Sequence, residues 1–178
     1  MRYAAFLRGI NISGKNKIPM VELKKYFEEA GFEDVITLLN SGNILFTSNK
    51  SADELYQFIP QLIEDKFSLD IPVFIRTKED LSDCLHHAPD WWGTENKEIY
   101  DNIIFLSKDL NYEEFLSEIG PLKDDLEQAE SYKDVIFWSY NLQNYQKTAW
   151  WSRTATVETI RDRITIRTAN TVRKLMEK

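Results

Sequence analysis

The 178-residue sequence predicts an α+β fold, because strand-like and helix-like segments alternate in a recognisable order. Residues 1–77 carry the order strand, helix, strand, strand, helix, strand, which is that of the ferredoxin-like split motif. A less clean pattern of strands and helices restarts near residue 78. We therefore divide the chain into a ferredoxin-like subdomain, residues 1–77, and a second α+β subdomain, residues 78–178, with a basic helical C-terminal segment.

Nearby residues in the sequence predict where the elements of the first subdomain begin and end. Gly31 ends the first helix, and Gly42 lies in a tight turn that favours a positive φ. Pro72 indicates either an edge position or the start of the last strand, whereas Pro60 is an irregularity inside the second helix. The expected elements are strands at 2–7, 34–39, 43–47 and 71–77, a helix at 20–30, and a helix opened by the capping box of Ser51 and Glu54.

The second subdomain is predicted from weaker patterns. Asn111 with Glu114 caps a helix, and Pro121 opens an acidic helix whose solvated face carries Asp124, Asp125, Glu127 and Glu130. No exact repeat is visible. The other expected elements are a helix at 78–88, strands at 102–106 and 134–140, and a largely helical segment at 147–178 interrupted by a β-rich piece at 164–166.

Composition places the chain among globular proteins, with 43% hydrophobic and 29% charged residues. The single cysteine, Cys84, excludes an internal disulfide framework, and the N-terminal residues lack the pattern of a secretory signal. No apolar run reaches the length of about 18 residues that a membrane span needs. We therefore expect a cytoplasmic protein that has no membrane partner.

Charge is unevenly distributed along the chain. The net charge is −7, which argues against a generic nucleic-acid binder, but residues 1–50 carry +2, residues 51–130 carry −14 and residues 131–178 carry +5. One interpretation is that the two basic ends converge on an anionic ligand. The other is that the lysines and arginines solvate terminal helices.

The loop from Arg8 to Lys17 is the strongest candidate site. It carries two glycines and three cations, and it leads from a strand into a helix that begins after Pro19. Backbone amides at a helix N-terminus favour negative charge, so the loop could cradle a phosphate, although it matches neither a P-loop nor a dinucleotide fingerprint. Alternatively, its glycines, asparagines and serine only satisfy local turn geometry.

Three other groups of residues are candidate sites. The turn Ser41-Gly42-Asn43 suits either a binding role or plain strand reversal. Cys84 and His87 lie three residues apart, and His86 is the only further histidine or cysteine. A closed zinc site needs four ligands, so Asp80, Asp83 or Asp90 would have to complete it, and we expect no metal. The tail combines Trp150 and Trp151 with basic residues, a mixture that could stack bases and neutralise phosphates. Adjacent tryptophans on a helix cannot both face one side, so one is expected in the core.

One set of residues in the first half of the chain forms a recognisable pattern: Phe6-Leu7-Arg8-Gly9-Ile10-Asn11, Gly14-Lys15-Asn16-Lys17-Ile18-Pro19-Met20, Leu23, Gly31-Phe32, Val35 and Ser41-Gly42-Asn43. This pattern resembles that of the bacterial domain-of-unknown-function 1697 family. Near the C-terminus, Thr165-Ile166-Arg167-Thr168-Ala169-Asn170-Thr171 is similar to a Thr-x-Arg-Asn-Trp-x-Thr signature, with Thr168-Ala169 in place of Asn-Trp. The resemblance implies two ferredoxin-like subdomains and no particular activity.

Together these observations predict a protein that binds a small anionic ligand through its phosphate or carboxylate group. Single-stranded nucleic acid or RNA is the alternative partner, and an enzyme of unknown reaction is a second alternative. No cofactor and no catalytic residue can be named. The expected ligand-binding residues are Arg8, Gly9, Asn11, Gly14, Lys15, Asn16, Lys17, Ser41, Asn43, Arg167 and Asn170.

Overall fold

The computed structural model describes residues 1–178, and the chain divides into two compact units. Unit 1 consists of residues 1–82 and 175–178, and unit 2 of residues 83–174. The chain therefore passes between units inside two helices, α3 (Lys78–His86) and α7 (Ala169–Met176). The sequence-based division after residue 77 lies at the start of α3.

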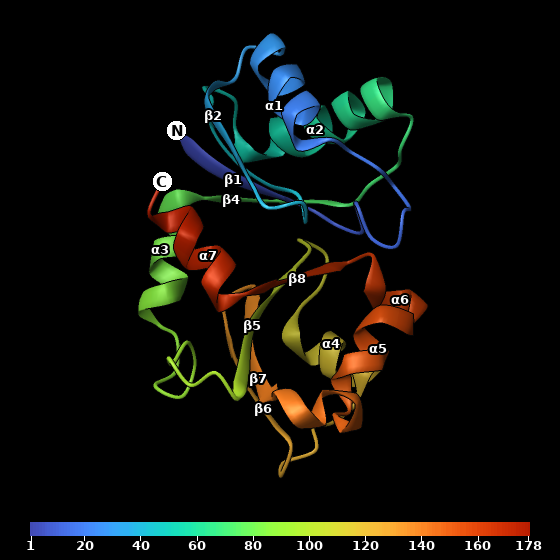
Figure 1. Cartoon of the computed structure of the whole chain (residues 1–178), viewed down its shortest axis with the longest axis vertical. Coiled ribbons are helices and arrows are strands. Elements are labelled where there is room, and N and C mark those ends of the chain that lie inside the picture. Colours follow the sequence, from blue (N-terminus) through green and yellow to red (C-terminus); the bar gives the residue numbers. More distant parts are fainter. The chain divides into compact units, whose positions relative to one another are not determined.

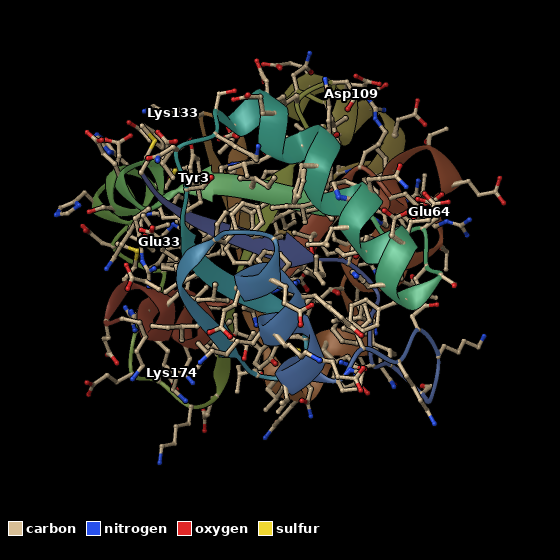
Figure 2. All side chains as sticks on the ribbon, turned by 90° about the horizontal axis from the view of Figure 1, so that it is seen from above. Tyr3, Glu33, Glu64, Asp109, Lys133 and Lys174 are labelled. Atoms are coloured by element: carbon tan, nitrogen blue, oxygen red, sulfur yellow. The ribbon has the colours of Figure 1, made fainter.

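Unit 1 is a four-stranded antiparallel sheet with two helices on one face. The sheet has the ferredoxin-like order β2-β3-β1-β4, which confirms the predicted motif. Figures 1 and 2 show both helices on the same side of this sheet. The elements are β1 (Arg2–Leu7), α1 (Met20–Glu29), β2 (Glu33–Leu38), β3 (Asn43–Thr47), α2 (Ala52–Phe67) and β4 (Val73–Thr77).

Local sequence explains these elements. Ser51 and Glu54 form the expected capping box of α2: the Ser51 hydroxyl accepts the Glu54 N–H at 3.3 Å, and the Glu54 carboxylate accepts the Ser51 N–H at 2.7 Å. Pro60 is accommodated inside the helix, and Pro72 precedes β4, which is an edge strand as predicted. The helices bury Leu23, Phe27, Leu55, Ile59 and Ile63 against the sheet.

Unit 2 repeats this plan. Its antiparallel sheet has the order β6-β7-β5-β8, so the second subdomain is also ferredoxin-like. Trp138, Phe115 and Trp150 lie at the centre of its core. The elements are β5 (Ile99–Leu106), α4 (Tyr112–Ile119), β6 (Glu127–Tyr132), β7 (Val135–Asn141), a 3₁₀ helix η1 (Leu142–Lys147), α5 (Trp150–Thr156), α6 (Glu158–Arg161) and β8 (Ile164–Thr168).

The predicted acidic helix after Pro121 is wrong. Residues 121–126 form no helix, and β6 pairs with β7 along its whole length, Glu127 opposite Tyr140 and Tyr132 opposite Val135. The polar composition of β6 hid a strand because charged residues are common on edge strands. Glu127 does not lie on a solvated face either: only 4% of it is exposed, and its carboxylate accepts the backbone N–H of Ala149 next to α5.

The buried Glu127 carboxyl makes unit 2 sensitive to pH. Burial raises its pKa above the ordinary value of 4.5, with the Ala149 N–H as the largest opposing influence. A raised folded-state pKa contributes stability that is present below pH 4.5 and is lost as the pH rises through the folded-state value. The variant Glu127→Gln should therefore gain stability relative to the natural chain as the pH rises from 4 to 8.

Urea unfolding of both proteins at several pH values measures this difference. The matched control changes the exposed neighbour Asp125 to asparagine, which removes a carboxylate that the fold does not bury. If Glu127→Gln and the natural chain keep a constant difference in unfolding free energy, burial of the charged carboxylate carries no cost and the prediction is wrong.

The two units also share a short sequence motif at the same place in the fold. Each last strand ends in Ile-Arg-Thr, namely Ile75-Arg76-Thr77 and Ile166-Arg167-Thr168. Each arginine is buried and its Nη1 donates to the preceding isoleucine carbonyl at 2.9 Å, and each threonine hydroxyl accepts an N–H from the first turn of the next helix. Three identical residues are too few to reveal a repeat until the fold aligns them.

Candidate functional site

The loop that leads from β1 to α1 is longer than this fold requires. It spans residues 8–19, twelve residues, whereas the equivalent connection from β5 to α4 in unit 2 spans residues 107–111, five residues. In Figure 1 it is the blue excursion between β1 and α1. Because unit 2 closes the same turn with a short link, the additional residues of unit 1 are not needed to connect the elements.

Two asparagine side chains hold the loop in shape. Asn11 uses Oδ1 to accept the Ile18 N–H at 2.8 Å and Nδ2 to donate to the carbonyls of Ile18 and Asn40, each at 2.9 Å. Asn16 donates from Nδ2 to the Gly9 carbonyl at 2.9 Å. These amides therefore position the loop. Five loop residues have a positive φ: Gly9, Asn11, Ser13, Gly14 and Asn16.

Two lysines of the loop are available to a ligand. Lys15 and Lys17 are exposed and take part in no ion pair within the protein. Arg8 is half-buried, and its backbone N–H donates to the Pro72 carbonyl at 3.0 Å. An open pocket of about 330 Å³ lies on this loop, lined by Asn11, Gly14, Lys17, Ile18, Pro19 and Asn40.

The N-terminus of α1 adds unpaired donors beside that pocket. Pro19 is the N-cap, and no side chain caps the helix. The first backbone N–H groups of a helix have no intrahelical partner and carry part of its positive dipole. Glu22 is the acidic residue of this first turn, so the helix end is not purely positive. The pocket nevertheless combines a lysine, loop amides and a helix N-terminus.

The turn at Ser41 to Asn43 is joined to the loop. Asn43 is fully buried, and its Nδ2 donates to the Leu38 carbonyl at 2.8 Å and to the Ser41 hydroxyl at 2.9 Å. The Gly42 carbonyl accepts the Leu7 N–H at 2.8 Å, and φ of Gly42 is +82°, as predicted. Together with the bond from Asn11 to Asn40, these contacts bring turn and loop into one corner of unit 1.

The C-terminal candidates belong to the other unit. Only 7% of Arg167 is exposed, and its Nη1 donates to the Thr165 hydroxyl at 2.8 Å as well as to the Ile166 carbonyl. Asn170 is exposed in the first turn of α7. Thr168, which replaces the asparagine of the family signature, caps α7 through its hydroxyl. Because Arg8 and Arg167 belong to different units, their convergence on one anion stays a prediction.

The histidine and cysteine group has its own internal contacts. Cys84 is buried, and the chain contains no cluster of three or more His, Cys, Asp or Glu side chains suited to a metal ion. The His87 ring stacks on that of Tyr132 at 4.2 Å between centroids. Lys133, whose Nζ lies 2.5 Å from the Asp83 carboxylate, keeps the pKa of that carboxyl below its ordinary value.

The tail residues proposed to contact nucleic acid are largely engaged inside unit 2. Trp150 is fully buried whereas 43% of Trp151 is exposed, which confirms that the two adjacent tryptophans face different ways. Arg163 forms ion pairs with Asp109 and Glu114 at 3.2 and 2.9 Å. Arg153 and Arg173 donate to the backbone carbonyls of Glu118 and Gly93. Nucleic-acid binding stays a prediction that no contact favours.

The fold and this corner define an α+β protein of two ferredoxin-like units, of which the first carries an elongated basic loop. The chain belongs to the protein family of unknown function DUF1697, whose family model matches residues 1–137. That match includes the whole candidate loop and the turn beside it.

A solved structure shares the entire architecture. It is that of the conserved bacterial protein SP0830 from Streptococcus pneumoniae, which is 30% identical and superimposes with a TM-score of 0.85, covering 99% of this chain and 97% of that one. A search of curated proteins found no match. None of the helices combines the length and the apolar character that crossing a membrane requires.

Proposed function

We propose that the protein binds a small phosphate- or carboxylate-containing ligand at the loop of residues 8–19. The observation that supports this most is the difference between the two units. The loop of unit 1 has twelve residues with three cations and no acidic residue, where unit 2 makes the same connection with five residues, one lysine and one aspartate. Residues that a fold does not need, arranged with one sign of charge, are typical of a binding loop.

The chemistry of the pocket supports an anion in particular. Lys15 and Lys17 present ammonium groups that no carboxylate of the protein neutralises, and charge-assisted hydrogen bonds are stronger than neutral ones. Asn11 and Asn16 fix the loop before a ligand arrives, so binding requires little ordering of the backbone. The helix end adds donors suited to an oxyanion.

The test is a calorimetric titration with inorganic phosphate, phosphate monoesters and citrate. Replacing both Lys15 and Lys17 by alanine should weaken binding about tenfold or more, because a hydrogen bond to a charged group contributes roughly 1.5–3 kcal/mol. The matched control replaces Lys24 and Lys25, two exposed lysines of α1 that pair with Glu28 and Glu29. It removes the same charge and should leave the affinity nearly unchanged.

Two results would contradict this assignment. If no anion binds the natural chain at low ionic strength, the loop has no such function. If both double variants weaken binding equally, the ligand responds to net charge and the loop is not its site.

A further inference from the structure

We infer that the ligand of the loop joins its anionic group to an apolar group, as an aryl or alkyl phosphate does. This inference rests on the function proposed above and specifies its ligand class. It comes from two exposed aliphatic side chains, Ile12 and Leu39, which are the sequence neighbours of the pocket residues Asn11 and Asn40.

Ile12 and Leu39 are unusual in their exposure. Ile12 is 61% exposed and Leu39 is 50% exposed, and they are two of the seven large hydrophobic residues that the chain leaves exposed. They come from segments far apart in the sequence, the loop and the turn between β2 and β3. The 2.9 Å bond from Asn11 Nδ2 to the Asn40 carbonyl ties those segments together, so the two aliphatic residues belong to the same corner of unit 1.

The stability of the fold does not explain why a leucine occupies position 39. Its φ is +58°, in the left-handed region, where an asparagine or glycine is accommodated far more easily than a leucine. A half-exposed leucine in that conformation gains little from burial and carries backbone strain. An apolar contact with a ligand gives this side chain a role that folding alone does not.

The pocket has the size and lining for such a ligand. Its volume of about 330 Å³ falls in the range of about 300–1,000 Å³ that small-molecule sites occupy. The exposed Pro19 contributes apolar surface to the wall, and Lys17 contributes charge. Neither residues 8–19 nor residues 38–43 contain an acidic side chain. Cation and aliphatic surface together complement a molecule that carries a phosphate at one end and an apolar group beside it.

The experiment compares three ligands by calorimetry: inorganic phosphate, glycerol phosphate and phenyl phosphate. Phenyl phosphate should bind about fivefold to tenfold more tightly than glycerol phosphate, which is the effect of burying roughly 40–60 Å² of additional apolar surface. In the double variant Ile12→Ser, Leu39→Asn this preference should fall to about twofold or less, with the affinity for inorganic phosphate unchanged.

A control variant tests whether the preference for phenyl phosphate depends on Ile12 and Leu39 or on exposed hydrophobic side chains in general. Leu142→Asn removes an aliphatic side chain that is 47% exposed in unit 2, and it should keep the preference for phenyl phosphate. The thermal midpoint of Leu39→Asn reports on folding: because asparagine tolerates the left-handed conformation, the midpoint should equal or exceed that of the natural chain.

The outcomes distinguish this inference from the function on which it rests. Equal binding of phenyl and glycerol phosphate overturns the apolar part and leaves anion binding intact. Absence of binding by all three ligands overturns the proposed function itself. Vesicles that contain phosphatidic acid test a lipid source of the phosphate group. If the protein binds these vesicles but shows no preference among the soluble esters, the site recognises a lipid headgroup and the inference of a soluble ligand is wrong.

Discussion

Replacing Trp150 by alanine is expected to lower the free energy of unfolding by about 3–5 kcal/mol, the usual loss when a buried aromatic residue is truncated. Trp150 is fully buried and donates from Nε1 to the Gly120 carbonyl at 3.0 Å. Its ring lies 5.1 Å from that of Phe115 and 5.9 Å from that of Trp138. Alanine would leave a cavity at the centre of unit 2 and a carbonyl without its donor.

The neighbouring residue provides the control. Trp151 is 43% exposed and contacts the rings of Tyr140 and Tyr145 at its edge, so Trp151→Ala should cost no more than about 1.5 kcal/mol. Chemical denaturation followed by far-ultraviolet circular dichroism compares the two variants without depending on tryptophan fluorescence. Equal losses at the two positions would mean that Trp150 is not the core residue of α5.

Gly42→Ala is expected to destabilise unit 1 by about 2–5 kcal/mol, through backbone strain and overpacking together. Gly42 is buried at φ +82°, and a methyl group there would lie 2.8 Å from Leu7 Cβ and 2.7 Å from Ile10 Cδ1. Leu7 belongs to the central strand β1 and cannot retreat without disturbing the sheet. Loss of this turn should also weaken anion binding, because the turn anchors the loop through Asn40.

The variant Gly14→Ala separates the effect of backbone strain from that of overpacking. Gly14 has a similar φ of +75°, but no atom lies within 4 Å of the position that a methyl group would take. It should therefore show the backbone strain alone, about 1–2 kcal/mol. Thermal or urea unfolding of both variants measures the difference. If Gly42→Ala is no less stable than Gly14→Ala, the corner rearranges to accept the methyl group and the close packing we describe is not limiting.

Most elements could be predicted because their signals are local. The capping box at Ser51, the short apolar runs of β1 and β3, and the glycine of the Gly42 turn each depend on residues a few positions apart. The strand β6 could not be predicted in this way. Glu127 to Tyr132 is polar and follows Pro121, which is typical of a helix start, and only pairing with β7 makes it a strand.

In the candidate site, too, some features follow from local sequence and others only from the tertiary fold. The cations and glycines of the loop are visible in the sequence, so composition and spacing were enough to select the loop as the candidate site. That Asn11 bonds to Asn40, 29 residues away, is a property of the tertiary fold, and so is the placing of Ile12 and Leu39 in one corner. Likewise, nothing local shows that the loop is elongated. That appears only when β1 and α1 are compared with β5 and α4.

The two crossings of the chain, inside α3 and α7, have a consequence for the timing of folding. Unit 1 includes residues 175–178, and Leu175 among them is fully buried. During synthesis, residues 1–82 leave the ribosome long before that segment does, whereas unit 2 is one continuous stretch, residues 83–174. Unit 1 therefore receives its last segment only after the whole of unit 2 has been synthesised, although its four strands and two helices all lie within residues 1–77.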